Sequence, residues 1–235
     1  MIIAYLKQVI RAAAGGKKIP SIVSLLRQFK LYVYYQRNTD VFQNAIPWVT
    51  FSAIEFLENY LKKDMKVFEF GGGGSTLFFA GRTKELVTVE HDPEWFSALT
   101  AQMKTRTDII WKSYLVPPEP AATGGVDPSD PTHYVSSGQQ YSKKTFRSYA
   151  SVIDQFPDDY FDLVVVDGRS RPSCTVHSLK KVKPGGLLLI DNADRQYYLK
   201  NVNHLLGNFS LVCNDFGPVP YYSFFSQSNI YQRIR

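Results

Sequence analysis

Short runs of strand-forming apolar residues recur from residue 47 onward, and segments with helical spacing separate them. The run Leu163–Val166 contains no polar residue, which is typical of a parallel strand that is buried on both faces. This alternation of strands and helices predicts one α/β domain with a mostly parallel sheet. The strands are expected at 67–70, 86–89, 109–111, 161–166, 187–190, 209–213 and 228–233, and the helices at 53–62, from 93 onward, at 172–182 and at 197–206.

The first 38 residues follow a different pattern. Apolar residues recur at helical spacing on both sides of a break at residues 14–20, where two glycines and a proline interrupt any helix. Two short amphipathic helices result. They form either a cap that is packed on the domain or an element that docks on a membrane surface or a partner. We therefore expect residues 1–45 to form a basic helical extension of a domain at 46–235.

Residues 116–148 break the pattern of alternating strands and helices. Five prolines and three glycines make this loop longer than compact domains usually contain without a purpose. Aromatic and basic residues alternate toward its end, as in Tyr141, Lys143 and Phe146. The segment is interpreted as a lid-like insertion that closes over an anionic or sugar-like acceptor, with disorder as the competing interpretation.

Charge is distributed unevenly along the chain. The net charge is +6 over 235 residues, but seven basic residues precede Asp40, the first acid, so residues 1–38 carry +7 and the remainder carries −1. The expected partner of residues 1–38 is an anionic membrane surface, and no nucleic acid is expected. Two cysteines without metal-ligand spacing indicate free thiols in a reducing compartment. The predicted location is cytoplasmic, with peripheral membrane attachment as a variant.

The strongest chemical signal is the segment Lys66–Thr76. A strand drops into four consecutive glycines, Gly71–Gly74, and a helix follows. Glycine permits unusual backbone angles and lets a ligand lie directly on the main chain. About twenty residues later a second strand ends in Glu90, and a carboxylate at that point can accept the hydroxyls of a ribose. A plain tight turn is the competing interpretation of the glycines.

These features resemble the nucleotide-binding half of class I S-adenosylmethionine (SAM) dependent methyltransferases. The segments Phe161–Gly168 and Val182–Asn192 are similar to that family's fourth and fifth strands, and the likeness runs from about Pro47 to the C-terminus. Ser75 stands where many members have a third glycine. The resemblance implies a Rossmann-like seven-stranded sheet of order 3-2-1-4-5-7-6 with a C-terminal antiparallel hairpin. It also implies SAM as cofactor, with binding residues Glu69, Gly71, Gly72, Gly73, Ser75, Thr76, Glu90, His91, Asp167 and Gly168.

Carboxylates at the ends of strands four and five are the candidates for catalysis. Asp167 and Asp191 are the best-placed general bases, and His91 is a weaker candidate because it lies at the ribose end. The set Asp167, Asp191 and Asn192 also resembles the Mg²⁺ site of cation-dependent O-methyltransferases. The competing interpretation is that nearby guanidinium groups neutralise the carboxylates and bind an anionic acceptor instead, from Arg169, Arg171 and Arg195.

The sequence thus predicts a SAM-dependent methyltransferase that acts on an oxygen or nitrogen of a small-molecule or carrier-linked acceptor. Two alternatives stay open. An NAD-dependent oxidoreductase would share the glycine turn and Glu90 but would lack the acid at Glu69 and the terminal hairpin. A non-catalytic SAM-binding scaffold would need no acids on strands four and five.

Overall fold

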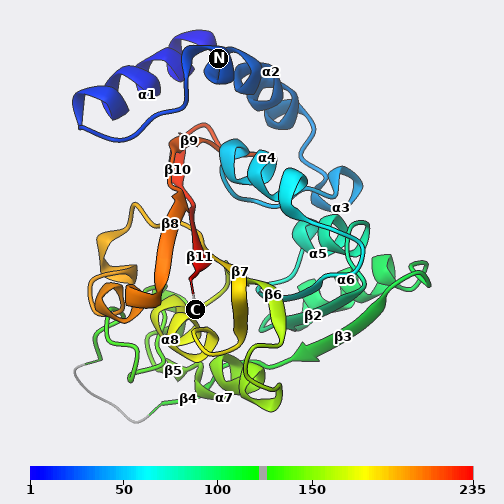
Figure 1. Cartoon of the computed structure of the whole chain (residues 1–235). Coiled ribbons are helices and arrows are strands. Elements are labelled where there is room, and N and C mark those ends of the chain that lie inside the picture. Colours follow the sequence, from blue (N-terminus) through cyan, green and yellow to red (C-terminus); the bar gives the residue numbers. More distant parts are fainter. Residues whose placement is uncertain (122–125, 235) are drawn as a thin grey trace.

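A computed structural model describes residues 1–121 and 126–234 of the chain, and a seven-stranded sheet forms its centre (Figure 1). The strand order is β3-β2-β1-β6-β7-β11-β8. Only β11 runs antiparallel to its neighbours, so the order predicted from the family resemblance and the reversed last strand are confirmed. The strands are β1 (Lys66–Phe70), β2 (Glu85–Glu90), β3 (Ile110–Leu115), β6 (Phe161–Val166), β7 (Val182–Ile190), β8 (Phe209–Cys213) and β11 (Asn229–Arg233).

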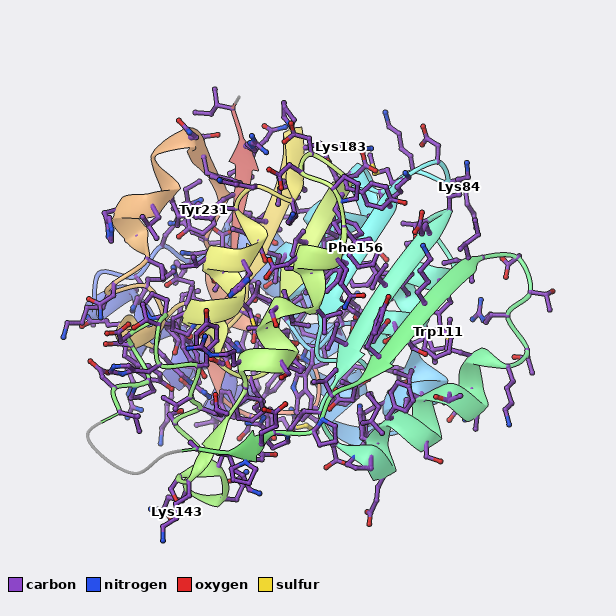
Figure 2. The ribbon with its side chains drawn as sticks, turned by 90° about the horizontal axis from the view of Figure 1, so that it is seen from below. Lys84, Trp111, Lys143, Phe156, Lys183 and Tyr231 are labelled. Atoms are coloured by element: carbon purple, nitrogen blue, oxygen red, sulfur yellow. The ribbon has the colours of Figure 1, made fainter. Side chains whose placement is uncertain are left out.

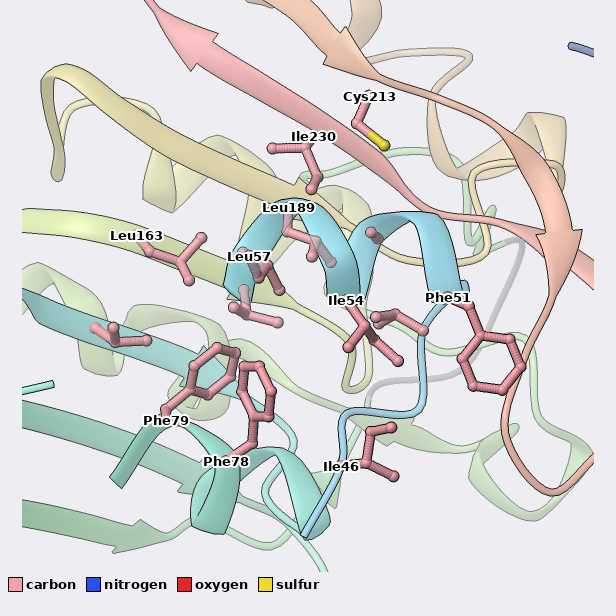
Figure 3. Close-up of a cluster of buried hydrophobic side chains, with 14 of the residues drawn as sticks. Ile46, Phe51, Ile54, Leu57, Phe78, Phe79, Leu163, Leu189, Cys213 and Ile230 are labelled. Carbon is pink, nitrogen blue, oxygen red and sulfur yellow. The ribbon is translucent and has the colours of Figure 1, made fainter. Parts of the chain in front are cut away.

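Helices cover both faces of this sheet because successive strand residues point to opposite sides. Leu163 and Leu189 face the side covered by α4, α5 and α6, whereas Val164 and Val166 face α7, α8 and the turn η2. In the first of these clusters, Leu57 and Phe79 pack around Leu163 and Leu189 (Figure 3). The elements are α4 (Phe51–Tyr60), α5 (Gly74–Ala80), α6 (Pro93–Met103), α7 (Arg147–Ala150), η2 (Ser151–Gln155) and α8 (Arg171–Ser178).

Two predicted helices differ from the observed elements. Helix α8 ends at Ser178, four residues early, because β7 already begins at Val182. The segment predicted as a helix at 197–206 forms two 3₁₀ turns, η3 (Gln196–Tyr198) and η4 (Asn203–Asn208). Asparagine is a weak helix former, and the Asn201 amide instead donates to Ser129 in the insertion.

The N-terminal helices form the outermost layer at one end of the molecule (Figure 1). They are α1 (Ile2–Ala14) and α2 (Ile22–Arg37), and the short α3 (Val41–Asn44) follows them beside α5. The buried Tyr5 donates to the carbonyl oxygen of Leu25 at 2.8 Å, and its ring lies 5.1 Å from that of Phe225. One face of each helix is therefore packed on the domain, as the cap interpretation predicted. The domain boundary at residue 45 stays a prediction.

The described part of the insertion is folded onto the domain. Strands β4 (Glu119–Pro120) and β5 (Lys144–Thr145) pair with each other, η1 spans Gln139–Tyr141, and Val135 and Phe146 are buried. Lys143 points outward from this segment (Figure 2). The lid and disorder interpretations also cover residues 122–125, which lie outside the described residues. A further hairpin, β9 (Phe216–Pro218) with β10 (Phe225–Gln227), precedes β11.

Candidate functional site

A cavity of about 500 Å³ lies at the carboxyl ends of the central parallel strands. This is the edge where α/β sheets bind their ligands, and the volume suits a small molecule or cofactor. One wall comes from the turn after β1 and the tip of β2, and we call it the donor wall. The opposite wall follows β6 and β7, and we call it the acceptor wall. The two walls contribute Gly71–Ser75, Glu90 and His91 on one side and Asp167–Arg169, Arg171 and Asp191 on the other.

The donor wall depends on a glycine at the exact exit of β1. Gly71 has φ +88°, a conformation that side chains disfavour. A Cβ atom at Gly71 would lie 2.9 Å from the Cα atom of Gly168 in the turn after β6. The two turns therefore lie against each other and bring the two walls together. The next carbonyl, that of Gly72, accepts from the Trp95 indole nitrogen at 2.6 Å.

Glu69 lies behind the glycine turn. Its carboxylate is fully buried and accepts from Ser75 Oγ and Thr88 Oγ1, each at 2.8 Å. Burial raises the pKa of Glu69 to about 7, although hydrogen bonds from neighbouring hydroxyls oppose the shift. Thr76 Oγ1 accepts from the Gly73 N–H at 3.0 Å. Neither Glu69 nor Thr76 lines the cavity, so we correct their predicted contact with the cofactor to a supporting position under the turn.

Glu90 lies at the tip of β2 and lines the cavity, as expected of a ribose ligand. Its Oε2 accepts from the Gly72 N–H at 3.0 Å, and its Oε1 accepts from the N–H groups of His91 and Asp92 at 2.7 and 2.8 Å. The carboxylate therefore also ties the glycine turn to the tip of β2. A substitution at Glu90 will affect the turn as well as any ligand.

His91 is held from two sides. Its Nδ1 lies 2.6 Å from Glu90 Oε1, and its Nε2 lies 2.8 Å from the hydroxyl of Tyr141, which belongs to the insertion. Arg169 approaches the same Nε2 at 3.3 Å and lies over the Tyr141 ring. The insertion thus contributes the side chain of Tyr141 to the cavity, and its role as a lid stays a prediction. The Nε2 of His91 is thus engaged by Tyr141, whereas Nδ1 lies close to Glu90 without a hydrogen bond of good geometry.

Arg171 organises the acceptor wall. Its buried guanidinium lies between two carboxylates, with Nη2 2.8 Å from Asp167 Oδ1 and Nη1 3.3 Å from Asp191 Oδ2. It also donates to the main-chain oxygens of Asp167, Gly168 and Asp191. Although burial lowers the pKa of Arg171, the carboxylates raise it further, so the group stays charged.

The two carboxylates differ in access. Asp191 is 2% exposed and accepts from Ser228 Oγ at 2.7 Å through its other oxygen. The Asp167 side chain keeps 22% exposure. Burial and the charge of Asp191 raise the pKa of Asp167 well above its usual range, and Arg171 only partly offsets this. Asp167 is therefore the one of these two carboxylates that a ligand can reach.

The predicted Mg²⁺ site does not fit this geometry. Arg171 fills the space between Asp167 and Asp191, and the Asn192 amide donates to Ser226 Oγ at 3.0 Å instead of facing them. Among the described residues, no three His, Cys, Asp or Glu side chains are grouped so that they could hold a metal ion. Arg171 pairs with both carboxylates, as the competing interpretation expected of a nearby guanidinium, and the binding of an anionic acceptor by these groups stays a prediction.

Aromatic side chains form the outer rim of the cavity. The Trp48 ring stacks on Tyr222 at 4.7 Å between ring centroids, and Tyr222 stacks on Phe224 at 4.6 Å. All three line the cavity while 37–44% exposed. Trp48 thus lies at the entrance of the cavity.

Several site residues were missed from the sequence. Tyr198 lines the cavity 5.1 Å from the Arg171 guanidinium, and this positive charge lowers the pKa of Tyr198 although burial raises it. The contacts of Tyr222, Phe224 and Ser228 also carried no signal in the sequence. These three residues follow a segment with one glycine and two prolines, in which no periodic pattern predicts the course of the chain.

Comparison with known proteins gives the class of fold. No family model and no curated protein matches the sequence. Among solved structures, an rRNA methylase from Streptococcus thermophilus aligns with 77% of this chain and 93% of its own, at 12% identity and a TM-score of 0.51. A methyltransferase-like protein from Silicibacter pomeroyi aligns with 76% of this chain and 83% of its own, at 22% identity and a TM-score of 0.49.

The fold is that of the class I SAM-dependent methyltransferases. The sheet order, the reversed last strand and the glycine turn after β1 are its features. At 12% identity the likeness concerns the fold alone. The chemistry of this protein therefore has to be argued from its own cavity.

Proposed function

We propose that the protein transfers the methyl group of SAM to an oxygen or nitrogen atom of a small or carrier-linked acceptor. One observation carries the proposal: a single cavity on this fold has carboxylates of two different kinds on its two walls. Glu90 is held beside the glycine turn, where a ribose can be bound. Asp167 lies opposite, with a raised pKa that suits proton removal.

The donor wall positions the cofactor in this proposal. Glu90 accepts from the ribose hydroxyls, and the main chain of Gly71, Gly73 and Ser75 lies along the methionine part. Because Glu90 also holds the Gly72 N–H, the ribose site and the turn move as one unit. Gly168 touches the turn from the other side and fixes its distance to Asp167.

The reaction on the acceptor wall is a direct displacement. When bound, SAM would supply its methyl group to a lone pair of the acceptor, and S-adenosylhomocysteine (SAH) would be the leaving product. The acceptor proton passes to Asp167. Arg171 keeps the Asp167 carboxylate in place, and the walls hold the two reactants in line. Asp191 is a positioning residue here because Ser228 and Arg171 occupy its oxygens.

The two alternatives have less support. A nicotinamide-dependent oxidoreductase normally continues its sheet with parallel strands, whereas β11 runs antiparallel between β7 and β8. A non-catalytic SAM-binding scaffold gives no reason for a partly exposed carboxylate of raised pKa in the cavity.

Titration calorimetry with SAM, SAH and NAD tests the proposal. We expect SAM and SAH to bind and NAD not to. Glu90→Gln should weaken SAM binding about tens- to a hundredfold, because charge-assisted hydrogen bonds worth about 2–3 kcal/mol are lost. The control is Glu85→Gln, the same change of a buried acid at the far end of β2. It should leave SAM affinity unchanged even where it lowers stability.

Binding of NAD without SAM would refute the proposed function. Equal SAM affinity in Glu90→Gln and the wild type would refute the ribose assignment alone. Because Glu90 also supports the turn, the melting temperature of each unliganded variant has to be measured beside its affinity.

A further inference from the structure

The N-terminal helices carry a second apolar face that the domain does not cover. On α1 the side chains of Ile2, Ile3, Leu6 and Ile10 are exposed, and Ile3 and Ile10 each keep 67% of their surface. On α2 the same spacing recurs twenty residues later. There Ile22, Val23 and Leu26 are exposed, with Val23 at 79%.

This face is distinct from the one that packs on the domain. Tyr5 and Ala12 on α1, and Leu25 and Tyr32 on α2, are buried. Residues three, four or seven apart lie on the same side of a helix, so the two buried residues of each helix share one side. The exposed apolar residues lie on the adjoining side. Each helix therefore buries one apolar stripe and leaves another open. Large contiguous apolar patches are rare on a surface that contacts only water.

Basic residues border the open stripes. Lys7 and Arg11 are exposed on α1, and Lys30 and Arg37 are exposed on α2. None of these four forms an ion pair within residues 1–121 and 126–234. By contrast, Arg27 pairs with Glu55 and Lys18 pairs with Asp215. No acidic residue precedes Asp40, so the whole surface carries positive charge.

The charge decides between the candidate occupants. A second copy of the chain would bring an equal positive charge against this surface, which is unfavourable. A nucleic acid would match the charge but would leave the isoleucine and leucine side chains in water. An anionic lipid surface provides phosphate and carboxylate groups at its face and an apolar layer directly below them.

We propose that the outer face of α1 and α2, which we call the docking surface, binds an anionic membrane surface. The helices lie on the bilayer and do not cross it. In the described part of the chain, no helix combines the length and apolar character that crossing requires. The open stripes enter the boundary between headgroups and acyl chains, and the bordering cations contact the headgroups.

The docking surface is connected to the cavity by aromatic side chains. Tyr35 of α2 contacts Tyr221 at 5.8 Å between ring centroids, Tyr221 contacts Trp48 at 5.6 Å, and Trp48 lies on the rim of the cavity. Tyr35 belongs to the domain-facing side of α2, so the helix that bears part of the docking surface also packs toward the rim of the cavity. We therefore expect a carrier-linked acceptor held at the lipid surface to reach the cavity. This last consequence rests on the proposed function, and the docking itself does not.

Vesicle sedimentation with the full-length protein tests the proposal. The probes are vesicles of phosphatidylcholine alone and of phosphatidylcholine mixed with phosphatidylserine, each at low and at high salt. We expect binding to the mixed vesicles only, and weaker binding at high salt because salt screens the charges. Lys7→Ser with Arg11→Ser should lower the partition constant about thirtyfold, since each cation near an anionic surface contributes about 1 kcal/mol.

The apolar stripe is tested by Ile3→Ser with Leu6→Ser, which should also release the protein from mixed vesicles. The matched controls are Leu211→Ser with Val212→Ser, two exposed residues of the edge strand β8, and Lys62→Ser with Lys63→Ser after α4. Both should bind as the wild type does. Because all these side chains are exposed, every variant should keep the wild-type melting temperature.

Three outcomes would overturn the proposal. They are a wild type that ignores mixed vesicles, controls that lose as much binding as the test variants, and a wild-type dimer in solution that Ile3→Ser with Leu6→Ser converts to a monomer. The last result would assign the open stripes to a second copy of the chain. SAM affinity, measured on the same variants, should not change, so failure of docking and failure of the proposed function are distinguishable.

Discussion

The two walls of the cavity hold their carboxylates by different means. On the donor wall, main-chain N–H groups and hydroxyls surround Glu69 and Glu90. On the acceptor wall, one buried guanidinium serves both Asp167 and Asp191. The carboxylates on the donor wall are thus held by hydrogen bonds from uncharged groups. The carboxylates of the acceptor wall are held by ion pairs, in which one cation serves two acids.

This difference bears on how the carboxylates of the two walls take up a proton. Burial and the neighbouring charge of Asp191 raise the pKa of Asp167, and the one guanidinium of Arg171 offsets only part of this shift. Glu69 on the donor wall also has a raised pKa, but it is fully buried and away from the cavity. We therefore expect protonation of Glu69 to affect stability and, under the proposed function, protonation of Asp167 to affect the reaction.

The largest expected effect is on activity. Asp167→Asn should lower kcat about 10²- to 10⁴-fold, the usual contribution of a general base, and leave SAM affinity nearly unchanged. The fold should persist because Arg171 keeps Asp191 as a partner. In the wild type, the rate should rise with pH through the raised pKa of Asp167. Release of SAH, with an acceptor found by screening hydroxyl and amino compounds, measures both effects.

The variant Asp191→Asn distinguishes the two acids. It should reduce kcat less than Asp167→Asn does, because Asp191 only positions its neighbours. A larger loss of kcat in Asp191→Asn than in Asp167→Asn would make Asp191 the general base and Asp167 the positioning residue.

The next largest effect is on stability. Arg171→Met should lower the free energy of unfolding at pH 7 by about 3–5 kcal/mol, because it leaves two carboxylates without their cation in a buried site. Urea unfolding measures the loss. The control Arg195→Met removes an exposed guanidinium on the same rim and should cost less than about 0.5 kcal/mol.

The charge balance itself can be tested with a double variant. Arg171→Met with Asp167→Asn should lose less than the sum of the two single changes, because the second change removes a charge that the first left unpaired. Strict additivity would show that the two groups are not coupled.

The smallest of the three effects concerns the donor wall. Glu69 ionises at about pH 7 in the folded protein and near 4.5 when unfolded, so the folded state holds the extra proton between these values. The free energy of unfolding should therefore fall as pH rises from 4.5 to 7 and then level, by about 3 kcal/mol from this group. Glu69→Gln should remove this part of the decrease of the unfolding free energy with pH.

Urea unfolding at a series of pH values measures the difference between the wild type and Glu69→Gln. Glu94→Gln, an exposed acid on α6, should keep the wild-type slope. If Glu69→Gln keeps it as well, the buried carboxylate is not the group that titrates.

The apolar pattern of the sequence predicted the strands of the sheet, and the family resemblance of its motifs implied the strand order and the residues of the donor wall. Parallel strands that are buried on both faces appear as short apolar runs, and the glycine turn and Glu90 lie on consecutive strands about twenty residues apart. The connection between neighbouring strands leaves few arrangements, so a local pattern was enough to bring these groups together.

Only the tertiary structure decided the acceptor wall. Whether Arg171 or a cation lies between Asp167 and Asp191 depends on one side-chain orientation, which no periodicity encodes. Ser228 reaches Asp191 because β11 returns antiparallel and pairs Asn229 with Ile190. Tyr141 reaches His91 from an insertion fifty residues later. Such contacts join segments that are distant in sequence, and their geometry is set by packing after the local elements have formed.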